Sequence, residues 1–127
     1  MNKLEYAVKM KHSGYNCCQA VLLAYVEELG LTEECLTKLG AGFGSGMGTM
    51  EGTCGALCGA EMILGLYGYE GRRMNPQAGN MQNSFKEKCG ATICKDLKGV
   101  ETGKMLCSCD DCVRNAVRLV EEQVMKN

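Results

Sequence analysis

Two long apolar runs constrain the fold of this chain more than any other feature of its sequence. They cover 16–29 and 54–67, and within each run the apolar side chains recur at three- and four-residue steps. This spacing is typical of α-helices, and no window of the chain alternates apolar and polar residues as a half-buried strand does. Because neither run has a broad polar face, we expect two central helices, the first of which ends at Gly30.

The segments around these runs predict shorter and more polar helices. We expect them over 3–11, 32–39, 75–89 and 93–98, and a last one from Cys109 to about Lys126. Residues 1–127 are too few for two ordinary domains and contain no linker or repeat, so the sequence predicts one all-α domain, a bundle of about five to six helices. Residues that commonly cap helices stand at four of the expected starts: Asn16, Thr32, Thr53 and Ser108.

The charge balance excludes several partners. The chain has 14 Lys and Arg against 15 Asp and Glu and no basic cluster, so we expect neither a nucleic acid nor an anionic membrane as its partner. No run of about 18 uncharged apolar residues is present, so no membrane insertion is expected. The first six residues carry charges where a signal peptide needs an apolar run, which predicts a cytoplasmic location. In that reducing compartment, ten cysteines indicate metal binding or catalysis rather than structural disulfides.

Glycine occupies every second position over 40–48, which suits neither a helix nor an ordinary strand. We expect a glycine-rich loop before the second apolar helix, with backbone N–H groups free to bind a small anion or cluster sulfurs. Gly44 and Gly46, together with Gly55 at the start of that helix, are therefore candidate cofactor-binding residues. A tight packing turn is the alternative. Two methionines beside the stretch could add thioether ligands for Cu(I): Met47 and Met50.

Four of the ten cysteines stand at expected helix starts. Cys17, Cys54 and Cys109 each follow directly on a residue that commonly caps helices, and Cys94 follows such a residue one step later. Free backbone N–H groups and the positive end of the helix dipole favour an anion there, and they lower the pKa of a thiol below its usual value of about 8.5. A thiolate is both a nucleophile and a metal ligand. If these helix starts converge, they form one site with several activated thiols.

The other cysteines have weaker signals. Cys18, Cys35 and Cys58 lie on apolar helix faces and are expected in the core. Cys58 also forms a CxxxC pair with Cys54. The run 107–112 contains a CxC and a CxxC, either of which is compatible with a metal site or a vicinal disulfide pair. A zinc finger is not indicated, because the chain has a single histidine and no second CxxC pair.

Several of these motifs together resemble the C_GCAxxG_C_C family, whose members are described as redox-active proteins with four characteristic cysteines. The matching segments are Asn16–Leu22, Gly42–Gly48, Cys54–Gly59, Cys94–Leu97 and Cys109 with Val113 and Arg114, so that the resemblance spans residues 13 to 124. It implies that the four family cysteines are Cys17, Cys54, Cys94 and Cys109, with Cys18 as an alternative to Cys17 and with Cys107 or Cys112 as alternatives to Cys109. The family is similar in part to split-Soret cytochromes c, but haem is not expected here because the CxxCH motif is absent.

Three hypotheses for function follow. In the first, Cys54 is the reactive thiol in thiol–disulfide exchange or electron transfer with an unidentified redox partner protein, and Cys17, Cys94 or Cys109 is the resolving partner. In the second, the same four cysteines bind an iron–sulfur cluster or zinc. In the third, the cysteines are only structural.

Glu61, the one charge in the second apolar run, either marks an exposed strip or accepts protons beside the thiols. Bundles of this size often form homodimers, although nothing in the sequence sets a symmetry.

Overall fold

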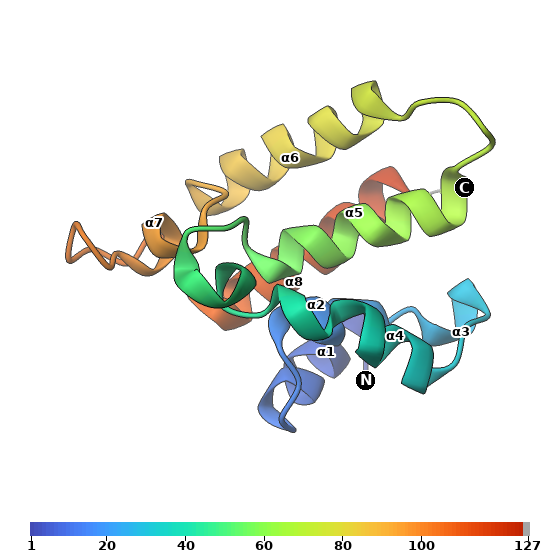
Figure 1. Cartoon of the computed structure of the whole chain (residues 1–127), viewed down its shortest axis with the longest axis horizontal. Helices are drawn as coiled ribbons and strands as arrows, with labels where there is room; N and C mark the ends of the chain where they lie inside the picture. The colour runs from blue at the N-terminus through green and yellow to red at the C-terminus, as the bar shows by residue number, and fades with distance from the viewer. Residues whose placement is uncertain (126–127) are drawn as a thin grey trace.

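The computed structural model describes residues 1–125 and confirms the all-α class (Figure 1). Within these residues there are eight α-helices and one isolated bridge but no strand. No helix in this part of the chain is long and apolar enough to cross a membrane. The helices are α1 (Lys3–His12), α2 (Cys17–Leu23), α3 (Val26–Leu29), α4 (Glu33–Gly40), α5 (Gly55–Gly68), α6 (Asn75–Cys89), α7 (Cys94–Lys98) and α8 (Cys109–Gln123).

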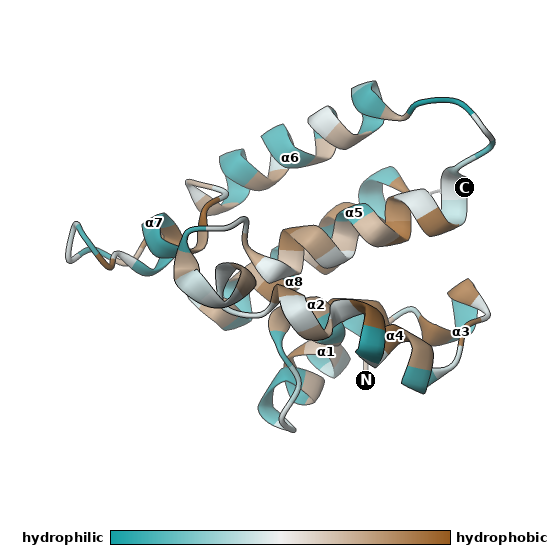
Figure 2. Cartoon of the chain, viewed as in Figure 1, coloured by the Kyte–Doolittle hydropathy of each residue, from teal (hydrophilic) through white to brown (hydrophobic). Residues whose placement is uncertain are grey.

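The two apolar runs supply the centre of the bundle, as expected. Helix α5 packs against both α2 and α8, while α1 and α6 pack against α8 from either side (Figure 1). Hydropathy follows this arrangement, since α5 is mostly hydrophobic along its length and α6 mostly hydrophilic (Figure 2). Helix α8 is amphipathic and buries Val113, Val117 and Val120. It ends at Gln123, before the expected end at about Lys126, which lies outside the described residues.

The first apolar run forms two helices rather than the single helix expected. The series of helical backbone hydrogen bonds is interrupted at Tyr25, between α2 and α3. The break turns the Tyr25 side chain into the core, where it is 1% exposed and its hydroxyl donates to the carbonyl of Val117 at 3.3 Å. The carbonyl of Ala24 is available to the ammonium of Lys3, which donates to it at 2.9 Å. Packing and long-range hydrogen bonds therefore override the continuous helical periodicity, and α3 then ends at Gly30 in the left-handed conformation, as expected.

Glycines in the CGAxxG segment allow α5 to lie against its neighbours at backbone contact. A Cβ atom added at Gly55 would lie 2.6 Å from the carbonyl oxygen of Phe43, and one at Gly59 would lie 3.0 Å from the carbonyl oxygen of Cys18 on α2. Both distances are shorter than ordinary van der Waals contact, so a side chain at either position forces the backbone apart. The glycine spacing of the motif thus has a packing role.

This packing role predicts opposite effects for two glycine substitutions on α5. Gly55→Ala is expected to lower the free energy of unfolding by about 1–3 kcal/mol, because backbone atoms have to move. Gly65→Ala is the matched control: nothing lies within 4 Å of a Cβ atom added there, and the gain in helix propensity should raise stability by up to about 1 kcal/mol. Urea unfolding measures the free energy of unfolding of each variant. Equal changes in the two variants would contradict the packing role of Gly55.

Candidate functional site

The N-terminal ends of α2, α5, α7 and α8 meet around one cavity of about 260 Å³. Its wall contains Cys17, Cys54, Cys94 and Cys109, so the structure brings together the four cysteines expected at helix starts. Two lysines also line it, Lys11 and Lys98. We call this space the four-cysteine cavity.

Two of the expected caps place their cysteines at the first helical position. The side chain of Asn16 accepts from the backbone N–H of Gln19 at 2.8 Å, and the Gln19 side chain accepts in return from the backbone N–H of Asn16 at 2.9 Å, which completes a capping box. Ser108 caps α8 with its hydroxyl. Cys17 and Cys109 therefore stand among the free N–H groups of α2 and α8, as expected.

Thr32 caps α4 as expected, but the caps expected for the helix starts at Cys54 and Cys94 are wrong. Thr53 does not cap α5, because Cys54 itself is the N-cap residue, and α7 begins directly after Ile93 with no side-chain cap from Thr92. A contact between segments far apart in the sequence sets the backbone here instead, because Thr53 and Ile93 form an antiparallel bridge. In it the N–H of Cys54 donates to the carbonyl of Thr92 at 2.8 Å, and the N–H of Cys94 donates to the carbonyl of Gly52 at 3.0 Å. This bridge holds Cys54 and Cys94 side by side.

The glycine-rich stretch is a pair of tight turns rather than an open loop. These are the 3₁₀ turn η1 (Ala41–Phe43) and the wider turn η2 (Gly46–Met50). Three non-glycine residues have a positive φ angle here: Ser45 (51°), Met47 (60°) and Met50 (65°). Such strained residues cluster at functional sites, and Ser45 and Met50 line the four-cysteine cavity, whereas Met47 is largely exposed.

Close packing explains the glycines that were candidates for cofactor binding. A Cβ atom at Gly44 would lie 2.8 Å from the Cβ atom of Asn16, and one at Gly46 would lie 2.7 Å from the Cβ atom of Cys94. These contacts favour the packing-turn alternative. Gly46 and Gly55 also line the four-cysteine cavity, while Gly44 is not part of its wall. A cofactor-binding role for the three glycines stays a prediction.

Hydrogen bonding and charge favour the thiolate at Cys109. The thiol of Cys17 donates to its sulfur, and the ammonium groups of Lys98 and Lys11 lie nearby, which together lower the pKa of Cys109 to about 5. The same hydrogen bond, with burial, raises the pKa of Cys17. This pair therefore consists of one thiolate and one thiol that are close neighbours in the cavity wall.

A second thiolate is favoured at Cys54. The neighbouring thiol of Cys112 and the N–H groups of Ala56 and Leu57 at the start of α5 favour the thiolate of Cys54, so that its pKa falls to about 7. Burial raises the pKa of Cys94 instead. The cavity thus favours two thiolates and two thiols, not four activated thiols, because neighbouring thiolates disfavour each other's ionisation.

Lys98 is a site residue that the sequence did not single out. Its ammonium donates to the carbonyl of Cys107 at 3.0 Å and lies 3.7 Å from the sulfur of Cys112, and it also lines the four-cysteine cavity. The only sequence signal is its position four residues after Cys94, on the same face of α7.

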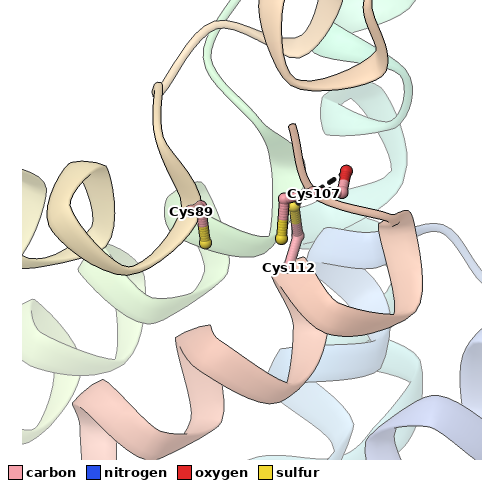
Figure 3. A group of neighbouring side chains, drawn as sticks. All are labelled: Cys89, Cys107 and Cys112. Carbon is pink, nitrogen blue, oxygen red and sulfur yellow. Dashed lines mark hydrogen bonds between the residues drawn. The ribbon is translucent and has the colours of Figure 1, made fainter. Parts of the chain in front are cut away.

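A second group of thiols lies beside the cavity. The sulfur atoms of Cys89, Cys107 and Cys112 all lie within 4.8 Å of one another, and all three residues are buried (Figure 3). We call them the buried triad. The CxC and CxxC spacing of the run 107–112 indicated two of them, Cys107 and Cys112, as candidates for a metal site or a disulfide. Cys89 is the last residue of α6 and lies far from both in the sequence, so no spacing indicated it. The amide of Asn115 donates to the Cys89 sulfur at 3.3 Å, and with the neighbouring thiols of Cys112 and Cys107 it lowers the pKa of Cys89 to about 6. The Cys112 thiol itself donates to the carbonyl oxygen of Cys107 at 3.9 Å (Figure 3).

The remaining thiols do not reach the cavity. Cys18 is fully buried in the core and Cys58 is half-buried, but the expectation for Cys35 is wrong, since it is exposed on the polar side of the short helix α4. Glu61 is half-buried, and burial raises its pKa to about 7. It lines a separate hollow together with Cys58, not the four-cysteine cavity.

Fold and site together define a class: a cysteine-rich, all-α protein whose helix N-termini gather thiols around one cavity that two lysines also line. The chain belongs to the family described as "Putative redox-active protein (C_GCAxxG_C_C)", whose family model matches residues 15–123. The resemblance seen in the sequence is thereby confirmed. No match was found among curated proteins or among solved structures.

Proposed function

We propose that the four-cysteine cavity is a thiol–disulfide exchange site in which Cys109 is the first nucleophile and Cys17 resolves the intermediate. The observation that carries this proposal is the convergence of four thiols and two lysines on one cavity. Exposure favours the assignment within it: Cys17 and Cys109 are half-buried, whereas Cys54 and Cys94 are only 4% and 6% exposed. The sequence suggested Cys54 as the reactive thiol, but an incoming partner protein meets Cys109 first.

The exchange needs no oxidant other than the partner's own disulfide. The Cys109 thiolate attacks one partner sulfur, the partner S–S bond breaks, and the second partner sulfur leaves as a thiolate. Cys17 then transfers its proton to that leaving sulfur and attacks the Cys109 sulfur. This forms a Cys17–Cys109 disulfide and releases the first partner sulfur, the one that Cys109 had attacked, as a thiolate, so two electrons pass from the cavity to the partner. In a cytoplasmic setting, which stays a prediction, the cavity would be reduced at rest.

A redox titration tests this proposal directly. The protein is equilibrated without oxygen in mixtures of reduced and oxidised glutathione, free thiols are alkylated, and peptides are mapped by mass spectrometry. We expect a reversible Cys17–Cys109 disulfide to appear first as the mixture becomes more oxidising. If both cysteines stay reduced until all ten thiols oxidise together, the proposal is wrong.

An iron–sulfur cluster or zinc on the same four cysteines is the second candidate, and it also stays a prediction. Within residues 1–125, no three of the four cavity sulfurs lie within 4.8 Å of one another. A single tetrahedral zinc needs sulfurs about 3.8 Å apart, so the open arrangement suits a larger cluster better than one ion. Protein purified without oxygen would then contain stoichiometric iron and sulfide and absorb visible light. A colourless, metal-free protein with ten titratable thiols would rule out the metal site.

A further inference from the structure

The buried triad has no part in the exchange proposed above, yet it is built like a redox centre. Its sulfurs are within 4.8 Å of one another and come from the end of α6, the segment before α8 and the first turn of α8 (Figure 3). For a disulfide to form, two of these sulfurs have to approach from at most 4.8 Å to about 2.05 Å. Cys112 is fully buried and Cys89 is 3% exposed, so a disulfide formed here would be shielded from solvent reductants.

The buried triad and the four-cysteine cavity are adjacent. Lys98 belongs to both, since it lines the cavity and its ammonium lies 3.7 Å from the sulfur of Cys112. Cys109 of the cavity and Cys112 of the triad are one turn apart on α8. Cys54 completes the path, because it lines the cavity and the thiol of Cys112 is the neighbour that most favours its thiolate. From the half-buried Cys109 inward, the thiols form a continuous series.

We propose that the buried triad is a second redox centre, which receives a disulfide from the four-cysteine cavity through Cys54 and Cys112. This inference rests on the proposed exchange function. It gives the chain two disulfide sites: a cavity pair that meets the partner and a buried pair that stores the oxidised state. The stored disulfide joins Cys89 and Cys112.

Each transfer step balances without a further oxidant. The Cys54 thiolate attacks the Cys17 sulfur of the Cys17–Cys109 disulfide, forms a Cys17–Cys54 disulfide and releases the Cys109 thiolate. Cys112 then attacks the Cys54 sulfur, and its proton ends on the departing Cys17.

The last step uses the charge already present in the triad. The Cys89 thiolate attacks the Cys112 sulfur of the Cys54–Cys112 disulfide, forms a Cys89–Cys112 disulfide and releases the Cys54 thiolate. The negative charge that started on Cys89 therefore ends on Cys54, and two electrons have moved from the triad to the cavity. Hydrogen bonds from Asn115 and from the thiol of Cys107 hold Cys89 ready as the nucleophile.

The test follows both disulfides in time. Reduced protein is mixed with an excess of oxidised glutathione, quenched with acid and alkylating reagent, and mapped by mass spectrometry. In the unmodified chain we expect the Cys17–Cys109 disulfide first and the Cys89–Cys112 disulfide later. In Cys54→Ser the first should still form, while formation of the second slows by about tenfold or more. Cys58→Ser, which removes a half-buried thiol one turn further along α5, is the matched control and should leave both rates unchanged.

Cys89→Ser gives an independent readout in case Cys54→Ser does not fold. It should take up one disulfide per chain under conditions where the unmodified chain takes up two. If the triad oxidises at the same rate in the unmodified chain and in Cys54→Ser, the relay is wrong and the cavity exchange still stands. A stoichiometric metal ion that protects the triad thiols from alkylation would also overturn the relay. Absence of the Cys17–Cys109 disulfide itself would instead remove the exchange proposal on which the relay depends.

Discussion

Replacing Cys109 by Ser is expected to reduce the rate of disulfide exchange with oxidised glutathione by about a hundredfold or more, because a serine hydroxyl is not ionised at neutral pH and is a poor nucleophile. The fold should survive, since Ser108 still caps α8 and the new side chain is slightly smaller and more polar at a half-buried position. Far-ultraviolet circular dichroism and urea unfolding check the fold, and appearance of reduced glutathione measures the rate.

Two further measurements make this prediction specific. Cys35→Ser makes the same chemical change at an exposed thiol that does not line the cavity, and it should leave the rate unchanged. In the unmodified chain, alkylation of Cys109 requires the thiolate, whose pKa is lowered to about 5 by Cys17 and the two lysines. The alkylation rate should therefore be nearly constant above that pH and fall as the pH decreases through it. A rate that begins to rise only near the pKa of an ordinary thiol would show that the Cys17–Cys109 hydrogen bond does not activate Cys109.

Lys98→Met should have the broadest effect of any single lysine substitution. The ammonium of Lys98 helps to lower the pKa of Cys109, Cys54 and Cys89, which belong to both thiol groups. Methionine keeps the apolar stem but removes the charge, so each thiolate becomes less favourable. We expect alkylation of Cys109 at pH 5 to slow by about fivefold, because an opposite charge a few ångströms away typically shifts a pKa by about one unit, and a rise of one unit from about 5 lowers the thiolate fraction at that pH by this factor.

The matched control is on the same helix. Lys95→Met removes an ammonium that pairs with the exposed Glu101 at 3.6 Å and does not line the four-cysteine cavity. It should leave the pH profile of alkylation unchanged. If Lys98→Met and Lys95→Met give the same profile, electrostatic stabilisation by Lys98 is not what activates the thiols.

Local signals in the sequence were sufficient for most helices and for two of the cavity cysteines, Cys17 and Cys109. Apolar spacing predicted α5 nearly to the residue, and Asn16 and Ser108 were recognisable as caps because a cap interacts with amides only two or three residues away. The same local rule failed at Thr53, where an antiparallel bridge to Ile93 sets the backbone conformation instead. It failed also at Tyr25, where burial against α8 interrupts a continuous helical pattern.

By itself, the sequence determined the helical class, the central position of the two apolar runs and the placement of Cys17 and Cys109 at helix starts, because these follow from periods and caps within a few residues. Only the tertiary structure decided which thiols are neighbours. Cys89 lies next to Cys112, and Lys98 lies between the cavity and the buried triad, because helices far apart in the sequence cross there. The ionisation of each thiol depends on those neighbours through charge and hydrogen bonding over a few ångströms, and no sequence spacing records such distances.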